Sequence, residues 1–376
     1  MKQKQRNECY CMTEFSAADN HYMAIALKLA KRGKYSAHPN PRVGCVIVQN
    51  DQIVGQGWHQ ITGGAHAEVM ALKEAGDNAR NATAYVTLEP CAHQGKTGPC
   101  CDALVAADLS RVVIAVEDPF SEVSGQGKSK IEAAGINVSV GLLESGAKSL
   151  NSGYFSRIER NRPFVRLKVA TSIDGATAMS NGESKWITGE SARQDVQKLR
   201  ASSGGVMTGI GTVISDNPRL TVRDESITTR QPIRVLLDSQ LKASPEAHIF
   251  EGSAKTLVFC VNDKHRERYE NNHVKVHKIE TEDKRPELSM IFKILAKEGI
   301  NDLLVEAGPT LSGSLIENDL IDELVIYQAP HIMGSNTKSM FLTPKWESLQ
   351  DRLSLDIQDI RKIGADYRIT ARPINR

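Results

Sequence analysis

The sequence has 376 residues, of which 40% are hydrophobic and 24% are charged. This composition is typical of a soluble globular protein and excludes a fibrous or largely disordered chain, and the length predicts two or three domains. The formal net charge is only +2, so we expect no nucleic-acid partner, although a few arginines suffice to bind one phosphate.

The N-terminal segment Met1 to Glu14 is polar and charged. It lacks the apolar core of a secretory signal, and no later apolar run reaches the roughly 18 to 20 residues that a membrane span requires. We therefore expect a cytoplasmic protein without membrane contact. The chain has seven cysteines, an odd number that argues against a disulfide scaffold.

The first half alternates predicted helices and strands. Ser16 and Asp19 form a potential capping box that opens a helix, and Gly33 is expected to end it. Asn50-Asp51 predicts a hairpin between two strands. The predicted strands are 43–48, 53–58, 82–88, 111–116 and 136–140, and further helices are predicted at 65–75 and 100–107. This order predicts a three-layer α/β domain, followed by a polar linker over 156–162.

A second α/β series begins at Pro163. Its predicted strands are 164–169, 205–207, 233–237, 256–260, 303–305 and 324–328, and its predicted helices are 191–199, 288–297 and 311–316. We therefore divide the chain into one domain over 1–161 and another over 162–376.

A metal-binding pattern lies in the first half. His66 and Glu68 begin a helix, Cys91 follows a strand, and Cys100 opens a helix next to Pro99. Histidine and two cysteines leave the fourth tetrahedral position of zinc open, as in catalytic zinc sites. The order His-x-Glu followed by Pro-Cys and a second cysteine is the zinc deaminase signature, although its two cysteines usually have two residues between them and here have eight.

This pattern predicts hydrolytic deamination. Zinc lowers the pKa of a bound water towards about 7, and Glu68 is the predicted proton shuttle to a ring nitrogen and to the leaving ammonia. The simpler interpretations are a surface His-x-Glu pair with inert buried cysteines, or a structural zinc site in which Cys101 is a fourth ligand. We favour Cys100 over Cys101 as the ligand.

The second half carries weaker signals. Gly209 and Gly211 predict a glycine-rich turn, which on its own is no better evidence for a cofactor than for a tight turn. The segment from Glu306 to Ser314 predicts the end of a strand, a glycine turn and the start of a helix. The backbone amides at such a helix start favour a phosphate group. The alternative is that the hydroxyl side chains simply cap the helix.

Together the motifs resemble the bifunctional riboflavin-biosynthesis deaminase-reductase family of bacteria. In the first half they are Pro39-Asn-Pro-Arg-Val-Gly-Cys45, Gly57-Trp-His59, His66-Ala-Glu68, Glu89-Pro-Cys-Ala-His93 and Gly95-Lys-Thr-Gly-Pro-Cys100. In the second half they are Leu167-Lys-Val-Ala-Thr-Ser-Ile-Asp-Gly175, Gly182-Glu-Ser-Lys-Trp-Ile-Thr188, Asp216-Asn-Pro-Arg-Leu-Thr-Val-Arg223 and Glu306-Ala-Gly-Pro-Thr-Leu311. The wide cysteine spacing is normal in that family. Gly98, where proline is common, and the segment 118–123, which lacks an Asn-Pro pair, depart from its pattern.

The resemblance implies a cytidine-deaminase-like domain followed by a dihydrofolate-reductase-like domain. The first would deaminate 2,5-diamino-6-(ribosylamino)-4(3H)-pyrimidinone 5'-phosphate with zinc, and the second would reduce the ribosyl group to ribityl with NADPH. A homo-oligomer is also expected.

The resemblance also implies contact residues. Asn40 and His59 would lie near the pyrimidine. The NADPH contacts would be Ala170, Trp186, Thr212, Asp216, Ser239, Gly308, Pro309, Thr310, Leu311, Ser312, Gly313 and Ser314. The substrate contacts in the second domain would be Ser184, Arg200, Leu220, Arg223 and Glu306. Arg200 and Arg223 can clamp a phosphate, or merely be solvated, and Trp186 can equally be a core aromatic. A further hypothesis is that Lys168, inside the first strand of the second half, lies near the ribose.

Three other hypotheses remain open. A nucleoside or transfer-RNA deaminase would explain the zinc motif but leaves the C-terminal half without a task. A zinc-stabilised binding module would not depend on Glu68. Finally, only one of the two halves could be active.

Overall fold

The computed structural model describes residues 15–94, 98–120, 124–281, 285–343 and 346–374. The expected motif residues 95–97, the departing residues 121–123 and the N-terminal segment 1–14 lie outside this part of the chain. The chain separates into two compact units, residues 1–151 and 152–376, which are described separately. No helix in the described part is both long and apolar enough to cross a membrane.

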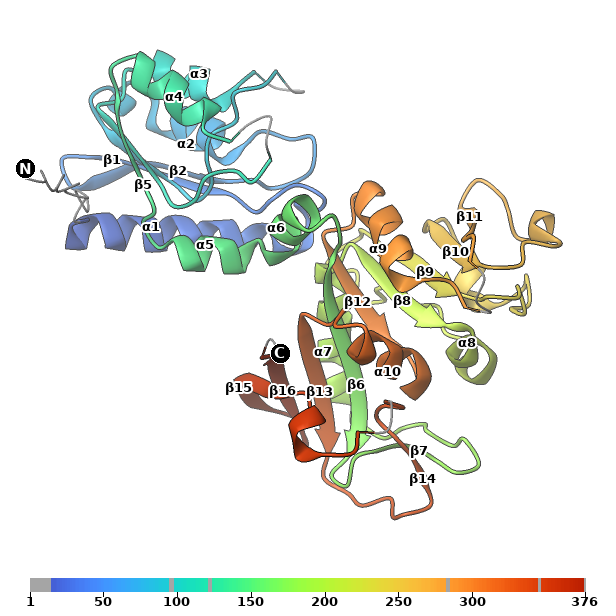
Figure 1. Ribbon diagram of the computed structural model, residues 1–376. Coiled ribbons are helices and arrows are strands. Elements are labelled where there is room, and N and C mark those ends of the chain that lie inside the picture. Colours follow the sequence, from blue (N-terminus) through green and yellow to red (C-terminus); the bar gives the residue numbers. More distant parts are fainter. Residues whose placement is uncertain (1–14, 95–97, 121–123, 282–284, 344–345, 375–376) are drawn as a thin grey trace, which may run out of the picture. The chain divides into compact units, whose positions relative to one another are not determined.

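Unit one is built on a five-stranded sheet in the order β2-β1-β3-β4-β5. Its strands are β1 (Gly44–Gln49), β2 (Gln52–Trp58), β3 (Thr83–Val86), β4 (Arg111–Ile114) and β5 (Asn137–Val140). Its helices are α1 (Ala17–Ala30), α2 (Ala67–Ala75), α3 (Cys100–Ala106), α4 (Gln126–Ala133) and α5 (Glu144–Leu150), with short 3-10 turns at Lys31–Tyr35 and Gly76–Ala79. Helices α1 and α5 cover one face and α2, α3 and α4 the other (Figure 1), so the three-layer prediction is confirmed.

Local sequence explains the first elements of unit one. The Ser16 side chain accepts from the Asp19 amide, and Asp19 accepts from the Ser16 amide, so the capping box that begins α1 is confirmed. Gly33 does not end α1, because the helix tightens into a 3-10 turn after Ala30. Asn50 and Asp51 both adopt positive φ in the hairpin between β1 and β2, as expected for turn residues that tolerate this conformation.

Unit two contains a nine-stranded sheet in the order β11-β10-β9-β8-β12-β6-β13-β16-β15. Its strands are β6 (Phe164–Ser172), β8 (Gly205–Gly209), β9 (Ile233–Leu237), β10 (Thr256–Cys260), β11 (Val274–Lys278), β12 (Asp302–Glu306), β13 (Glu323–Ala329), β15 (Leu355–Ile363) and β16 (Asp366–Pro373). A small separate sheet pairs β7 (Ala176–Met179) with β14 (Thr337–Ser339). The helices are α6 (Ser152–Glu159), α7 (Glu190–Ser202), α8 (Ile210–Asp216), α9 (Leu288–Lys297) and α10 (Pro309–Glu317), with 3-10 turns at His248–Phe250, Arg266–Arg268 and Leu349–Asp351.

The central strands of unit two bury both faces. On one face Leu167 and Val305 pack with Phe292 of α9 and Leu315 of α10. On the other face Leu304 packs with Val213 of α8 and other buried residues. Strands buried on both sides are typical of parallel sheets covered by helices, and the strands from β11 to β13 run parallel here.

Two local predictions were wrong. The polar stretch expected as a linker begins inside α6, where Arg157 donates to Asn301 of unit two and Gly153 packs against Asp302. The glycine-rich turn expected at Gly209 to Gly211 is instead the N-terminus of α8, which begins directly after β8. A division of activities near residue 161 remains a proposal.

Candidate active sites in the two units

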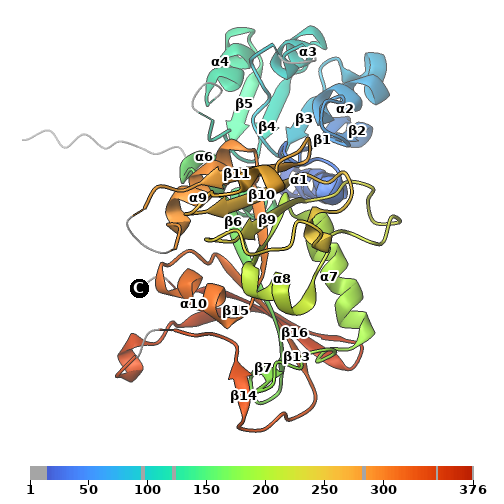
Figure 2. The same cartoon turned by 90° about the vertical axis from the view of Figure 1, so that its right-hand side faces the viewer.

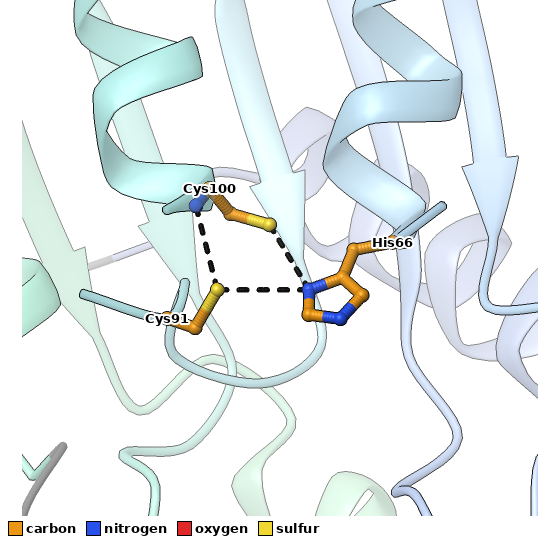
Figure 3. Close-up of side chains that lie close together, drawn as sticks. All are labelled: His66, Cys91 and Cys100. Carbon is orange, nitrogen blue, oxygen red and sulfur yellow. Dashed lines mark hydrogen bonds between the residues drawn. The ribbon is translucent and has the colours of Figure 1, made fainter. Parts of the chain in front are cut away.

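Three potential metal ligands converge in unit one. His66 is the residue that caps the N-terminus of α2, Cys91 follows β3, and Cys100 is the first residue of α3. Figure 3 shows their side chains directed toward one another from the two helix starts and the loop between them. Their donor atoms all lie within 4.8 Å of one another, although the chain separates them widely.

The distances within this cluster are short. His66 Nδ1 lies 3.2 Å from Cys100 Sγ and 3.6 Å from Cys91 Sγ. The Cys100 backbone amide donates to Cys91 Sγ at 3.4 Å, and the Cys101 amide donates to the Cys91 carbonyl oxygen at 3.2 Å. The N-terminus of α3 thus faces a thiol, which is the place where a thiolate is favoured.

The two thiols share protons unequally. Hydrogen bonding from the Cys100 thiol, together with His66, lowers the pKa of Cys91 to about 4. The pKa of Cys100 is raised because its thiol donates to Cys91 and is buried. One imidazole nitrogen and two sulfurs around a common centre fit zinc, which draws both thiols into the thiolate form.

Cys101 does not join this cluster. Its buried thiol donates to Asp102 Oδ1 at 3.7 Å. Among the described residues, the group able to hold a metal contains His66, Cys91 and Cys100 only. This geometry supports a site with three protein ligands over a structural site in which Cys101 is the fourth ligand.

Glu68 lies beside the ligands, in the first turn of α2, and is only 3% exposed. Burial raises the pKa of Glu68 to about 7, close to the value at which a carboxyl group both accepts and donates protons at neutral pH. Sequence reasoning gave Cys45 no role, yet its buried thiol lies near Glu68, and burial and this carboxylate together raise the pKa of Cys45.

The weaker candidates Asn40 and His59 lie next to the same site. The Asn40 amide nitrogen is 3.1 Å from His59 Nε2, and His59 Nδ1 is 3.3 Å from the Ala65 carbonyl oxygen. The His59 ring is 5.4 Å from that of His66. Burial lowers the pKa of His59, and the two contacts match a neutral ring that donates from Nδ1 and accepts at Nε2.

Several candidate residues of unit two gather at the carboxyl ends of its central parallel strands. Ala170 is on β6, Thr212 and Asp216 are on α8 after β8, Ser239 follows β9, and Gly308 follows β12. These four strands are parallel neighbours, so their carboxyl ends lie together, and this is where ligands bind to open α/β sheets.

A largely buried cluster of charged side chains lies at these carboxyl ends. Glu306 Oε1 accepts from Arg200 Nε at 2.6 Å, Glu306 Oε2 accepts from Arg200 NH2 at 3.0 Å, and Lys168 Nζ is 4.0 Å from Oε2. Arg200 NH1 donates to the Thr221 carbonyl oxygen at 3.1 Å. Lys168 therefore lies beside Glu306, a predicted substrate contact, and its place near the ribose stays a prediction.

Two of the predicted substrate contacts, Arg200 and Leu220, already interact with other parts of the protein. Each nitrogen atom of the Arg200 guanidinium donates one hydrogen bond within the protein, which leaves one N–H on NH1 and one on NH2 for a phosphate while the pair with Glu306 is kept. The Leu220 side chain is 2% exposed in the core beside α8, which leaves its backbone for a ligand. Arg223 is exposed on the loop after it, and Ser184 lies half-buried before Trp186.

Trp186 is not a core aromatic, since it is 68% exposed. The guanidinium carbon of Arg193 lies 4.6 Å from its ring centre. The preceding Lys185 pairs with Asp216 at 3.6 Å, so this loop is held against the end of α8. Lys185 thus connects the segment that carries Trp186 to Asp216, and both Trp186 and Asp216 are predicted NADPH contacts.

The run from Gly308 to Ser314 divides into two parts. Gly308, which caps α10, and Thr310 are exposed, and Pro309 and Leu311 are partly so. Ser312 and Gly313 are buried, and a side chain on Gly313 would overlap the Leu342 backbone. These two residues pack α10 against the chain, so a cofactor contact through them is not supported, whereas the exposed amides at the helix start fit a phosphate.

Comparison with known proteins covers both units. The model of the RibD C-terminal domain matches residues 163–369, and the model of the cytidine and deoxycytidylate deaminase zinc-binding region matches residues 16–116. The riboflavin biosynthesis protein RibD of Escherichia coli is 45% identical over 93% of this chain and 97% of its own length. The chain belongs to the RibD family.

Other RibD proteins agree along the whole length. The Haemophilus influenzae RibD is 43% identical over 96% of this chain and 99% of its own. A solved structure of Acinetobacter baumannii RibD is 42% identical, with a TM-score of 0.88, and covers 95% of this chain and 99% of its own. A second solved structure comes from Thermotoga maritima and is a diaminohydroxyphosphoribosylaminopyrimidine deaminase/5-amino-6-(5-phosphoribosylamino)uracil reductase. It is 32% identical, with a TM-score of 0.84, and the match covers 95% of this chain and 99% of the other. The predicted two-part fold, a cytidine-deaminase-like domain followed by a reductase domain, is confirmed.

Proposed function

We propose that this RibD-family chain catalyses two consecutive steps of riboflavin biosynthesis. The first is zinc-dependent hydrolytic deamination of 2,5-diamino-6-(ribosylamino)-4(3H)-pyrimidinone 5'-phosphate. The second is NADPH-dependent reduction of the ribosyl group, which gives 5-amino-6-(ribitylamino)uracil 5'-phosphate. The observation that carries the proposal is the convergence of His66, Cys91 and Cys100 beside buried Glu68, in a chain whose other half matches the RibD C-terminal domain.

In the deamination, His66, Cys91 and Cys100 would hold the zinc ion. Zinc at such a site supplies a Lewis acid that brings the pKa of water to about 7. The Glu68 carboxylate takes one proton from the attacking water and delivers it to a ring nitrogen, then takes the second proton from the hydroxyl group of the adduct and delivers it to the amino group, which leaves as ammonia. Asn40 and the neutral His59, which lie beside His66, would orient the pyrimidine through hydrogen bonds.

In the reduction, the second unit binds and orients two small molecules. NADPH supplies the hydride when bound, and the protein sets its position. The exposed start of α10 at Gly308 fits its phosphate groups, and Trp186 offers an exposed aromatic face. Glu306, with Lys168 and Arg200 around it, provides fixed charges at the carboxyl end of β12 for the ribose. Arg200 and Arg223 are the candidates for the substrate phosphate.

We also infer the setting of the enzyme. The cysteines of the described residues are all free, which fits a reducing cytoplasm. A net charge of +2 offers little attraction to nucleic acid. The edge strand β15 exposes Leu355, Ile357 and Ile360, and such an edge supports a homo-oligomer.

The test is direct. Purified zinc-loaded protein is incubated with the diamino-ribosylaminopyrimidinone phosphate, with and without NADPH, and the products are followed by mass spectrometry. Deaminated product without NADPH, and ribityl product only with it, is the expected result. Deamination without any reduction would reject the reductase assignment. Absence of turnover with zinc bound would favour a nucleoside deaminase or a structural zinc site.

A further inference from the structure

Glu89, two residues before Cys91, is a buried carboxylate that the proposed reaction does not use. It is 3% exposed. Its Oε2 accepts from the backbone amides of Asp118 at 3.2 Å and Gly125 at 3.0 Å, and its Oε1 accepts from the Lys128 amide at 3.2 Å. Within the described residues no cation forms an ion pair with Glu89, so these amides carry the stabilisation of its charge.

The three amides connect the zinc-ligand loop to a neighbouring helix. Gly125 caps the N-terminus of α4 and Lys128 lies in its first turn, where backbone N–H groups and the helix dipole favour an anion. Asp118 follows β4. The single side chain of Glu89 therefore ties the chain that carries Cys91 both to α4 and to the loop after β4.

Helix α4 also contacts α3, the helix that begins with Cys100. Lys130 Nζ of α4 lies 2.5 Å from Asp102 Oδ1, and Asp102 is in the same first turn of α3 as Cys100. Both views show α3 and α4 side by side (Figures 1 and 2). Gly127 of α4 lets the Pro90 carbonyl pack against the helix, because a side chain there would overlap that oxygen. Helix α4 thus touches the chain on both sides of the thiol pair.

We propose that Glu89 is a positioning residue of the zinc site, which acts through α4 to hold Cys91 and Cys100 at the separation that binds the metal. This inference rests on the proposed function of the site. Groups that orient metal ligands change metal affinity or activity by about 10- to 100-fold when they are replaced. Glutamine has the same shape but turns one acceptor oxygen into a donor, so Glu89→Gln leaves at least one of the three amides facing another N–H group.

The experiment compares Glu89→Gln and Gly127→Ala with two matched controls in the full-length chain. Glu132→Gln neutralises an exposed carboxylate of the same helix, and Gly146→Ala adds a methyl group that meets only Leu27 at ordinary contact distance. Zinc affinity is measured by competition with a chelator, and the thiolate-to-metal absorption is recorded after cobalt(II) is bound in place of zinc. We expect Glu89→Gln and Gly127→Ala to weaken zinc binding by about 10- to 100-fold and to alter the cobalt spectrum, with both controls and the reductase activity unchanged.

The inference would be overturned if Glu89→Gln had the zinc affinity and cobalt spectrum of the parent and only a lower melting temperature. That result would leave the proposed function standing. Failure of the parent chain to bind zinc tightly would overturn both. If near-ultraviolet circular dichroism shows that Glu89→Gln has lost the native packing of unit one, Gly127→Ala decides the question by the same two measurements.

Discussion

Glu68 is the residue that separates a catalytic zinc site from a structural one, because it lies at the site without being part of the ligand set. In Glu68→Gln we expect deamination to fall by about 10²- to 10⁴-fold, the usual contribution of a positioned acid-base group. Zinc content and the reductase rate should stay at the parent value. Zinc is measured by metal analysis and ammonia release by a coupled assay, with Glu74→Gln, an exposed position on the same helix, as the control. Full deaminase activity in Glu68→Gln would support the structural-zinc hypothesis.

Replacement of Lys168 tests the proposed reductase site of unit two. Its ammonium group lies 4.0 Å from Glu306 at the carboxyl edge of the sheet, and burial lowers the pKa of Lys168. We expect Lys168→Ala to slow the reduction by about a hundredfold, as the loss of one preorganised charge commonly does, while deamination is unchanged. NADPH oxidation at 340 nm with the deaminated substrate measures this effect, and Lys198→Ala, exposed on α7, is the control. An unchanged rate would remove Lys168 from the site.

At the scale of single elements, α1 shows how a local signal becomes a long-range contact. Asp19 caps the helix and also accepts from the Tyr85 hydroxyl and the Arg111 guanidinium, each at 2.8 Å. Burial alone would raise the pKa of Asp19, but these hydrogen bonds and those of Ser16 outweigh it and lower the pKa. A depressed pKa stabilises the fold fully above the unfolded value of about 3.9, and this stabilisation is lost as pH falls through the folded value.

Replacement of Asp19 should therefore change the acid sensitivity of unit one. We expect Asp19→Asn to lower the free energy of unfolding at pH 7 by about 1.5 to 3 kcal/mol, the contribution of a hydrogen bond to a charged group, and by less as the pH approaches 3. Urea unfolding of the full chain at several pH values, followed by circular dichroism, measures this. Asp77→Asn, at an exposed site, should follow the parent curve, and zinc release affects all three proteins alike. An equal loss of unfolding free energy at every pH would contradict the predicted dependence of stability on the Asp19 charge.

Elements with a strong local pattern were predictable from the sequence, and elements without one were not. The predicted helix 288–297 coincides with α9, whose apolar stripe buries Ile291, Phe292 and Leu295. Helix α4 was missed because it is short and polar, contains Gly127, and buries only one large apolar side chain, Ile131. Strand β15 was missed because nearly all of its residues are exposed, so apolar and polar positions do not alternate in burial.

The candidate sites divide in the same way. The zinc ligands were predictable because zinc requires particular residue types in a recognisable order. The pairing of Arg200 with Glu306 was not, because the two residues are 106 positions apart and no local pattern links them. The same holds for the burial of Leu220 and Ser312, which depends on packing against distant elements.

At the scale of the whole molecule, the proposed function places the residues of each activity in one unit. We expect a mixture of Glu68→Gln and Lys168→Ala proteins to form the ribityl product, because the deaminated intermediate released by one variant can diffuse to the other. Product formation by the mixture and by each variant alone is followed by mass spectrometry. A mixture no more active than either variant would mean that the intermediate does not leave the protein that makes it.

The exposed edge of the second sheet leads to a prediction about assembly. On β15, Ile357 is 57% exposed and Ile360 is 56% exposed. If this edge joins two copies of the chain, Ile357→Lys combined with Ile360→Lys should shift the mass in solution to that of one chain, because a buried unpaired charge opposes association. Light scattering after size-exclusion chromatography measures the mass, and Ile53→Lys on β2 is the control. An unchanged oligomer would place the interface elsewhere.

The position of β6 in its sheet has a consequence for biosynthesis of the chain. Among the described residues β6 pairs with β12 on one side and β13 on the other, and both partners are translated long after it. Unit one contains all the strands of its own sheet by Val140 and can form while the ribosome is still working, as domains commonly do. The first strand of unit two must instead wait, with both of its edges unsatisfied, until residues 302–329 have left the exit tunnel. During this interval both edges of β6 present unpaired backbone N–H and C=O groups to which another chain can pair.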